Sequence, residues 1–374
     1  MKKIKIGCIT FHASHNYGSN LQAYALQQYV KSIADVDYEI INLRTKIQKD
    51  IYNTCFNRKG LKPFIKRCLY FKYKDYLLLK YKRYEEFISN SLNITKELEK
   101  IDKNCDLNYD YYLSGSDQIW NLDPIDFEWS YFLEFVNKGK RISYSASFGP
   151  KFQSCSASDY ERVKKNLLKY EHISVREKGS YDNVKLLTGI EANINIDPTL
   201  LLSKDEWKKL ISSQPFQKGD YIFLYDLKKK KETYNLAKKI SRLLNMPIVV
   251  CSENIYSIRN NFIKRFDAGP KEFINLIYYS KLTLSTSFHG NVFSIIFNKP
   301  FYAVNSENDL RISNLLNLLG LKDRFINCDN YQEKIKNYDK IDFTVAKDKI
   351  AKEIIKSKRY LLMCLDMVEG EEIE

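Results

Sequence analysis

The sequence predicts an α/β protein with two Rossmann-like, parallel-sheet domains facing across a cleft. Short apolar segments rich in β-branched and aromatic residues alternate with segments of helical periodicity in both halves of the chain, which is typical of parallel sheets connected by helices. The chain has 374 residues, 44% of them hydrophobic, which is enough for about two domains with sizeable cores. Polar loops containing glycine follow several predicted strands, where such sheets usually bind ligands.

The first domain is expected to comprise residues 1–202. It opens with a buried strand, a polar loop and a helix, and the alternation continues to the X-Pro step at Pro198, which disfavours helix and precedes the domain crossover. Its predicted elements are strands at Lys3–Thr10, Tyr38–Leu43, Tyr109–Leu113, Arg141–Ser147 and His172–Val175, and a helix at Leu21–Ile33.

The second domain is expected to comprise residues 203–374 and to repeat the same plan. The last predicted helix, Asp348–Met363, has an apolar side and is expected to pack back onto the first domain. The other predicted elements are strands at Tyr221–Tyr225, Pro247–Cys251, Leu282–Ser285 and Phe301–Val304, and helices from the lysine run at Lys228–Lys231 to Leu244, at Lys271–Tyr279 and at Asn314–Leu319.

The stretch Leu282–Val304 contains the most specific chemistry in the sequence. A strand is followed by the turn Ser287–Gly290, a helix at Val292–Phe297 and a second strand, and His289 lies in the turn. At the carboxyl end of a parallel strand, the N–H groups that begin the next helix form a site for anions. The turn around His289 is therefore the first candidate for a ligand site.

Positive charge is concentrated in one segment. Of the net charge of +14, a surplus of eleven lies between Arg44 and Tyr84, where thirteen Lys or Arg stand against two acids and alternate with nine aromatic residues. This pattern suits a helical insertion, at about 44–103, that contacts an anionic membrane surface. The same pattern is also explained by a soluble helical segment, in which the aromatic residues pack in a core and the charged residues form a solvated face. Because no zinc, homeodomain or RNA-binding signature is present, nucleic acid is not an expected partner.

The remaining composition predicts a cytoplasmic location, with the basic segment giving a peripheral position at the inner face of the membrane. The apolar runs are too short for a signal-peptide core or a membrane span. The eight cysteines form no CxxC pair, so neither a disulfide framework nor a metal site is expected.

Six short motifs follow one another across most of the chain. They are Phe11-His12 with Asn16–Gln22, Ser114–Asn121, Ser143–Gly149, Ser174–Glu177, Asp197–Thr199 and Ser287–Gly290. In this order they resemble the motifs of the polysaccharide pyruvyl transferase family. The resemblance implies a fold similar to that of B-type glycosyltransferases, phosphoenolpyruvate as donor substrate with no further cofactor, and a free or lipid-linked glycan as acceptor. The product would be a pyruvate ketal in a surface polysaccharide, such as an exopolysaccharide or a capsule.

The implied reaction assigns chemical roles to residues in these motifs. Protonation of the enolpyruvyl methylene needs a general acid, for which the imidazole of His289 is suited. Asp117 is expected to accept the proton of the attacking sugar hydroxyl, with His15 as a substitute. Arg176 is expected to bind the donor's carboxylate or phosphate, because its planar guanidinium forms two parallel hydrogen bonds. The other expected contacts are Ser287 and Gly290 for the donor, and His15, Asn16, Tyr17 and Ser116 for the acceptor.

One position departs from the family pattern. Characterised members often carry Arg two residues before the histidine, where this chain has Ser287. An Arg there would bind the anionic groups of the donor, so another group must do so here. Arg176 and the N-terminus of the helix after Ser287 are the candidates.

Structural roles and other functions remain open at this point. His289 also fits a buried histidine at a helix start, Asp117 a helix cap, and Arg176 a surface ion pair with Glu177. A glycosyltransferase that uses a nucleotide sugar would share the fold and should bind uridine or cytidine diphosphate. A non-catalytic scaffold of a glycan-assembly complex is the third alternative. Ser287 favours it slightly, and the retained chemistry at His289 speaks against it.

Overall fold

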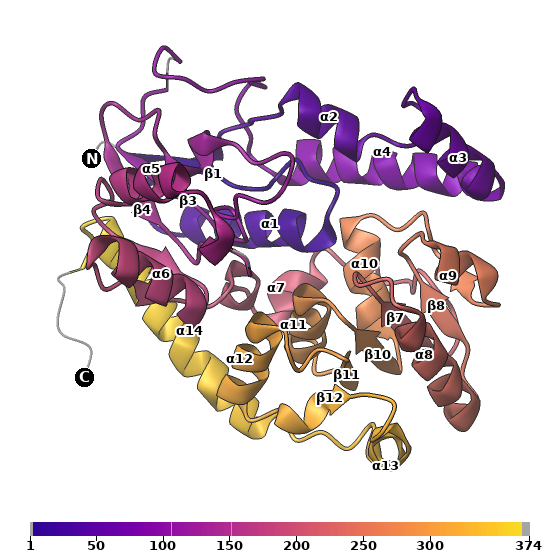
Figure 1. The fold of residues 1–374 in the computed structure, drawn as a ribbon. Coiled ribbons are helices and arrows are strands. Elements are labelled where there is room, and N and C mark those ends of the chain that lie inside the picture. Colours follow the sequence, from indigo (N-terminus) through magenta and orange to yellow (C-terminus); the bar gives the residue numbers. More distant parts are fainter. Residues whose placement is uncertain (1–2, 106, 151, 369–374) are drawn as a thin grey trace. The chain divides into compact units, whose positions relative to one another are not determined.

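The computed structural model describes residues 3–105, 107–150 and 152–368, which form two compact α/β units. Of these residues, unit 1 contains those within Met1–Tyr52, Ile88–Leu202 and Ala351–Glu374, and unit 2 contains those within Asn53–Phe87 and Ser203–Ile350. Both units are built on parallel strands joined by helices (Figure 1). The predicted α/β class with parallel sheets is therefore confirmed.

Unit 1 has a four-stranded parallel sheet in the order β2-β1-β3-β4. Ile6 of β1 pairs with Tyr38 of β2 on one side and with Tyr111 of β3 on the other. Two further strands, β5 and β6, form a short parallel pair next to it. The elements are β1 (Ile4–Ile9), α1 (Tyr17–Lys31), β2 (Val36–Ile40), α2 (Lys46–Tyr52), β3 (Tyr111–Ser114), β4 (Lys140–Ser143), α5 (Ala157–Leu167), β5 (Ser174–Val175), α6 (Lys178–Thr188) and β6 (Asn193–Ile194).

The core of unit 1 is strongly aromatic. Trp120 is fully buried, stacks on Phe132 with ring centroids 5.5 Å apart, and lies 5.3 Å from the ring of Phe148. Its indole N–H donates to Ser114 Oγ over 3.0 Å, so the one polar group of this side chain is paired inside the core. This packing fixes the loop that follows β3, and that loop carries Asp117.

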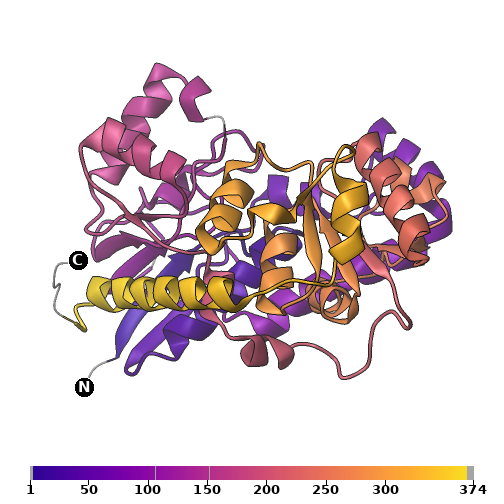
Figure 2. The same cartoon turned by 90° about the horizontal axis from the view of Figure 1, so that it is seen from below.

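The final helix, α14 (Thr344–Cys364), is bonded to unit 1 through its carboxyl half (Figure 2). Ser357 Oγ accepts hydrogen bonds of 3.2 Å from Asn195 Nδ2 and from the backbone N–H of Ile196. The hydroxyl of Tyr360 donates to the carbonyl of Ser143 at the end of β4. These bonds join the last part of the chain to the ends of the strands that precede the crossover.

Unit 2 has a six-stranded parallel sheet in the order β12-β11-β10-β7-β8-β9. Its strands are β7 (Ile222–Tyr225), β8 (Ile248–Val250), β9 (Ile263–Lys264), β10 (Leu282–Ser285), β11 (Phe301–Val304) and β12 (Phe325–Ile326). Its helices are α3 (Leu61–Tyr70), α7 (Lys204–Lys208), α8 (Lys231–Leu244), α9 (Ile255–Arg259), α10 (Pro270–Tyr279), α11 (Phe288–Ile296), α12 (Leu310–Leu319) and α13 (Tyr331–Lys334), while α4 (Lys74–Ser91) begins in unit 2 and ends in unit 1.

The segment Asn53–Phe87, expected as part of an insertion in the first domain, groups with unit 2. Tyr70 and Leu77 belong to the apolar cluster of that unit. Two ion pairs add to this packing, from Lys80 to Glu253 at 2.8 Å and from Arg83 to Asp267 at 3.0 Å. The contacts that decide this grouping are distant in sequence, so local patterns did not reveal them.

Helix starts differ from the expected positions in two functional motifs. Helix α1 begins at Tyr17 rather than at Leu21, because Asn16 caps it by accepting hydrogen bonds from two backbone N–H groups of the first turn. Helix α11 begins at Phe288. His289, expected in a turn, therefore lies in the first turn of a helix.

Candidate active site

The candidate site residues of unit 1 gather at the carboxyl ends of its strands. The loop after β1 leads to α1, the loop after β3 carries Asp117, and β5 is followed directly by Arg176. Strands β1 and β3 are adjacent and parallel, and parallel bridges connect the β5 segment to the β4 side of the same sheet, so their carboxyl ends lie at one edge. Side chains from segments far apart in sequence are thereby brought into contact.

Asp117 is held by two side chains from neighbouring segments, one in helix α1 and one directly after β5. Ser19, in the first turn of α1, donates its hydroxyl to Asp117 Oδ2 over 2.7 Å. Arg176 Nη1 lies 3.4 Å from Asp117 Oδ1. The backbone of Asp117 is left-handed, with φ of 76°, a conformation that Asp and Asn adopt more readily than most residues. Its side chain is 12% exposed, so the carboxylate is fixed and still reaches the surface.

Arg176 lies at the centre of a buried ion-pair cluster. Its side chain is 3% exposed and contacts Asp117, Asp197 at 3.0 Å and, through Nε, Glu177 at 3.4 Å. Burial lowers the pKa of Arg176, but the three carboxylates outweigh burial and raise it, so the guanidinium stays charged. A surface ion pair with Glu177 alone, considered from the sequence, is therefore not what this residue forms.

The formal charge of this cluster is −2, from one guanidinium and three carboxylates. Asp197 is also bonded to Thr199, whose backbone N–H and hydroxyl both donate to Oδ1. An anion placed beside Arg176 would face more negative than positive charge, whereas a neutral hydroxyl would meet a fixed acceptor in Asp117. The cluster is thus better suited to a neutral hydroxyl group than to an anion.

The loop between β1 and α1 contains the other residues expected near the acceptor. His15 is half-buried, with its ring stacked on Tyr52 at a centroid distance of 6.0 Å. Asn16 is exposed and caps α1, so its side-chain oxygen is already bonded to the backbone, and Tyr17 is buried. Ser116 is fully buried and donates to the carbonyl of Ser145 over 3.0 Å, which is a structural bond.

His12, in the same loop, is fully packed inside unit 1. Its Nε2 lies 2.9 Å from Asn42 Oδ1 and its Nδ1 lies 3.2 Å from the carbonyl of Thr10. Burial lowers the pKa of His12, although both hydrogen bonds favour the charged form. The start of this loop is therefore fixed by a buried, neutral imidazole that is hydrogen-bonded through both ring nitrogens.

In unit 2, the candidate residues lie where β10 leads into α11. His289 is 8% exposed in the first turn of α11, with its ring perpendicular to that of Phe288. Ser287 is the residue before the helix, and its backbone N–H donates to Ser285 Oγ over 3.0 Å. Its side chain makes no capping bond to the helix. The segment thus places an imidazole at the positive end of a nine-residue helix.

Gly290 is required by close packing. A Cβ atom on Gly290 would lie 2.2 Å from Ser285 Oγ and 3.2 Å from the ring of Tyr225. The first turn of α11 therefore approaches the end of β10 more closely than any side chain would permit. This gives Gly290 a packing role, beside the donor contact expected from the sequence.

Three further residues at this edge of unit 2 were not among the site residues predicted from the sequence: Asp226, Thr286 and Lys228. Asp226 follows β7, and its Oδ1 accepts a 2.8 Å hydrogen bond from Thr286 and a 3.0 Å bond from the backbone N–H of Lys228. Burial raises the pKa of Asp226, and the bond from Thr286 opposes this. Asp226 directly follows a predicted strand, so the strand-end argument applied to the other loops would have found it.

Lys228 reaches from the end of β7 to the end of β11. Its Nζ donates to the carbonyl of Asn305 over 2.8 Å and lies 3.4 Å from Ser306 Oγ. Burial lowers the pKa of Lys228. Because β10 lies between β7 and β11 in the sheet, this ammonium group spans the strand end that leads into α11.

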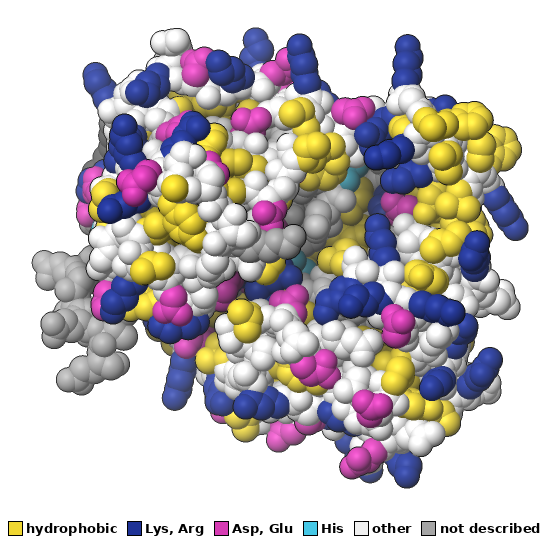
Figure 3. Space-filling view, in the orientation of Figure 1, with side chains coloured by type: hydrophobic (Ala, Val, Ile, Leu, Met, Phe, Trp, Pro, Cys, Tyr) yellow, Lys and Arg dark blue, Asp and Glu magenta, His cyan; other side chains and the backbone are white. Residues whose placement is uncertain are grey.

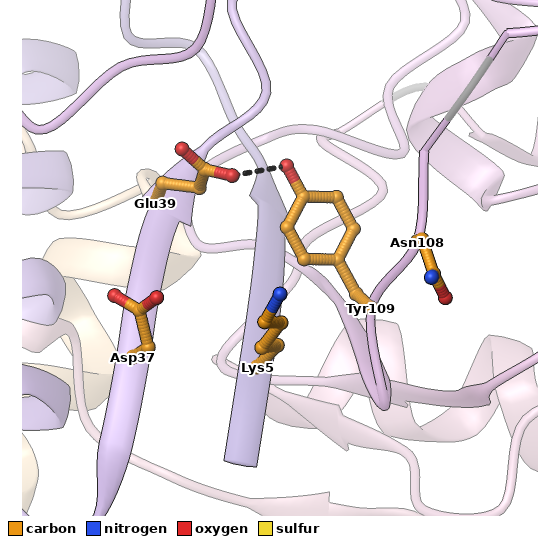
Figure 4. A pocket seen from close by; sticks show the side chains of 5 residues that line it. All are labelled: Lys5, Asp37, Glu39, Asn108 and Tyr109. Atoms are coloured by element: carbon orange, nitrogen blue, oxygen red, sulfur yellow. Dashed lines mark hydrogen bonds between the residues drawn. The ribbon is translucent and has the colours of Figure 1, made fainter. Parts of the chain in front are cut away.

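Two pockets of unit 1 lie away from these strand ends. One, of about 170 Å³, is lined by Lys5, Asp37, Glu39, Asn108 and Tyr109 near the beginning of β1 and β2 (Figure 4). Two of its lining residues are bonded to each other, because the hydroxyl of Tyr109 donates to Glu39 over 2.6 Å. A larger one, of about 720 Å³, lies against α5 and the segment 100–103. Neither contains a residue expected to act in catalysis.

Within the described ranges, no group of three or more His, Cys, Asp or Glu is arranged to hold a metal ion. In the same part of the chain, no helix combines the length and apolarity that a bilayer crossing requires.

Comparisons with known proteins identify both fold and family. The family model described as "Polysaccharide pyruvyl transferase" matches residues 16–308. No curated protein matches the chain in sequence. One similar structure is that of S. aureus MnaA with UDP, with a TM-score of 0.55, 12% sequence identity and coverage of 99% of each chain. A second is a protein described as "putative UDP-N-acetylglucosamine 2-epimerase from Listeria monocytogenes", with a TM-score of 0.54, 10% identity and coverage of 100% of each chain. A third is another UDP-N-acetylglucosamine 2-epimerase, with a TM-score of 0.52, 10% identity and coverage of 100% of this chain and 99% of that chain. These likenesses support the fold class similar to B-type glycosyltransferases.

Proposed function

Because the chain belongs to the polysaccharide pyruvyl transferase family, which is a family of transferases, we propose that it transfers a pyruvyl group from phosphoenolpyruvate to two hydroxyls of a glycan. The product would be a cyclic pyruvate ketal, and the second product inorganic phosphate. The observation that carries this proposal is the family match over residues 16–308, because that range contains Asp117, Arg176 and His289.

The proposed reaction balances as two additions to one carbon. The enolpyruvyl methylene takes a proton and becomes a methyl group, the first sugar hydroxyl bonds to the adjacent carbon, and the bond from that carbon to the phosphate oxygen breaks. The second hydroxyl then bonds to the same carbon. Two hydroxyl protons are lost, of which one replaces the proton given to the methylene and the other leaves with phosphate.

We assign the acceptor hydroxyl to Asp117 in unit 1. Its carboxylate is held on one oxygen by Ser19 and lies 3.4 Å from Arg176 on the other, so its direction is fixed before the acceptor binds. In this assignment Arg176 acts as a positioning residue, because its guanidinium is bonded to three carboxylates. Direct donor contact by Arg176, expected from the motif, is a competing role that the Arg176→Lys experiment below distinguishes.

We assign the donor to the edge of unit 2 that contains His289, Ser287 and Gly290. The positive end of α11 and the ammonium of Lys228 suit the phosphate and carboxylate groups, and they replace the Arg that the family often carries at the position of Ser287. His289, in the first turn of the helix, is then the general acid for the methylene carbon.

Ligand-induced stabilisation tests the choice of donor. A ligand that binds only the folded protein raises its melting temperature in proportion to the logarithm of ligand concentration over Kd. We expect phosphoenolpyruvate to raise the melting temperature and UDP not to, with a smaller rise in Lys228→Gln. The structural relatives with UDP in their names make the nucleotide-sugar glycosyltransferase the second candidate function. Stabilisation by UDP alone would favour it.

A further inference from the structure

Helix α3 in unit 2 presents an apolar stripe to solvent. Leu61, Phe64, Ile65 and Leu69 are 74%, 54%, 57% and 41% exposed, and the exposed Cys68 lies among them. Phe64, Ile65, Cys68 and Leu69 follow Leu61 by three, four, seven and eight positions. This spacing places all five side chains on one side of the helix. In a helix of a globular protein such a stripe normally faces the core, so this one is turned the opposite way.

The other side of α3 already packs against its own unit. Tyr70 is 7% exposed and belongs to the apolar cluster of unit 2. Arg67 is half-buried and donates to the carbonyl of Cys55 at 3.3 Å and to that of Arg58. The helix is therefore held to unit 2 from the side opposite the stripe, while Phe64 of the stripe also contacts the guanidinium of Arg67, which lies 5.7 Å from its ring centroid.

Apolar exposure continues beyond the helix. Phe71 is 71% exposed, and Tyr76 and Leu79 in the first half of α4 are 44% and 39% exposed. Figure 3 shows apolar side chains gathered at the upper right, over α3 and α4, with Lys and Arg side chains around them. A contiguous apolar surface of this kind, bordered by charge, is typical of an interaction site.

The charge around the stripe has almost only one sign. Residues 53–79 contain seven Lys or Arg and a single acid, Asp75. Lys62 and Lys66 lie on the flank of the stripe at helical spacing, and the exposed side chains also include Lys59, Lys72 and Lys74. Apolar and aromatic side chains in the middle with ammonium groups at the border match the interface of a bilayer with anionic headgroups.

We propose that this surface, made by residues 59–79, docks the protein onto an anionic lipid bilayer. The apolar stripe enters the boundary between headgroups and acyl chains, and the lysines at its flank contact lipid phosphates. Charge complementarity favours a bilayer over a second copy of the chain, because two copies would bring the same positive border together. The inference depends on this surface alone and not on the proposed reaction.

Co-sedimentation of the full chain with vesicles tests it. The protein is expected to bind vesicles of phosphatidylcholine mixed with phosphatidylglycerol, and not phosphatidylcholine alone. About 0.5 M salt should release most of it, because the Debye length then falls to a few ångströms. Phe64→Ser with Ile65→Ser should weaken binding about tenfold or more, since affinity scales with buried apolar area. Lys62→Gln with Lys66→Gln should weaken it and reduce its dependence on salt.

Matched control variants distinguish binding through this surface from non-specific binding to vesicles. Leu186→Ser with Ile355→Ser removes two side chains of 80% and 68% exposure elsewhere, and Lys349→Gln with Lys352→Gln removes the same charge from α14. Both controls should bind vesicles like the wild type. Activity on a water-soluble acceptor should be unchanged in the stripe variants, so loss of docking and loss of the proposed reaction are read separately.

A second measurement locates the stripe directly. Phe64→Trp should show a blue-shifted emission with anionic vesicles, and brominated lipids should quench it, because the new indole then lies in the interface. Equal binding to neutral vesicles, or full binding by the stripe variants, would overturn the proposal. Dimerisation of the wild type without vesicles that is abolished by Phe64→Ser with Ile65→Ser would also overturn it, by assigning the stripe to a second copy.

Discussion

Ser19 donates a hydrogen bond of 2.7 Å to Oδ2 of Asp117, although 98 positions separate the two residues in the sequence. The bond connects the first turn of α1 to the loop after β3. It orients a carboxylate that Arg176 holds from the other side. Unit 1 therefore has a hydrogen-bond acceptor whose position is fixed before any substrate binds.

The first prediction concerns this acceptor. Asp117→Asn keeps the size of the side chain and tolerates the left-handed backbone, but it removes the proposed base. We expect kcat to fall by about 100-fold or more, the usual scale for a lost base. Ser19→Ala, which only frees the carboxylate, should cause a smaller loss. Steady-state kinetics with saturating donor and acceptor measure both, and equal losses would show that Ser19 acts beyond positioning.

The second prediction distinguishes two roles of Arg176. Arg176→Lys keeps the charge but loses the planar geometry that contacts three carboxylates. If Arg176 positions Asp117, the melting temperature and kcat fall while the KM for phosphoenolpyruvate changes little. If it binds the donor, that KM rises well above the wild-type value. The KM and kcat of the folded variant decide between these roles.

The third prediction concerns His289. His289→Gln should lower kcat by about 100-fold or more while the melting temperature stays near that of the wild type, because the proposed general acid is lost and an amide fits the same space. His172→Gln, outside the candidate site, is the matched control and should keep full activity. Wild-type turnover in His289→Gln would remove the residue from the mechanism.

The fourth prediction concerns packing at the start of α11. In Gly290→Ala the new methyl group would lie 2.2 Å from Ser285 Oγ, so helix and strand must separate. We expect a loss of about 1–3 kcal/mol in the free energy of unfolding, the usual cost of overpacking. Gly179→Ala has no atom within 4 Å of its new methyl group and should be neutral or stabilising. Denaturant unfolding of the two variants compares them.

The fifth prediction follows from His12. Burial lowers the pKa of His12 in the folded protein below 6.5, its value in the unfolded chain. As the pH falls through 6.5, the unfolded chain therefore takes up this proton more readily than the folded protein does. The stability that the neutral imidazole contributes is therefore present above pH 6.5 and lost below it. The melting temperature should drop from about pH 7.5 to about pH 5.5, and the drop should be smaller in His12→Gln. An equal drop in the variant would assign the pH dependence to other groups.

The parts of the fold that the sequence predicted best are those with strong local signals. Leu282–Ser285 and Phe301–Val304 were predicted with the observed bounds, because each is an apolar run ended by polar or turn residues. Strands β6, β9 and β12 have two residues each, and so short a segment has no periodicity to detect. The start of α11 was placed too late because His289 and Gly290 resemble turn residues.

The contacts of the candidate site were predicted only in part. Asp117 and Arg176 were selected from their motifs, but their mutual contact depends on strand order and on the short strands β5 and β6. The negative surplus around Arg176 was likewise invisible, because Asp197 joins it from a loop 21 positions further along the chain. Asp226 follows a strand that was predicted, and it was missed for lack of a motif.

The proposed transfer is tested most directly by its two products. The purified protein is incubated with ¹³C-labelled phosphoenolpyruvate and a panel of lipid-linked and aryl glycosides, and glycan mass and inorganic phosphate are measured together. The account predicts that one glycan gains a single labelled pyruvyl ketal with an equal amount of phosphate released, and that Asp117→Asn and His289→Gln lose both. No label in any glycan and no phosphate released, while a parallel incubation with nucleotide sugars in place of phosphoenolpyruvate adds a sugar to one of the same acceptors, would contradict it.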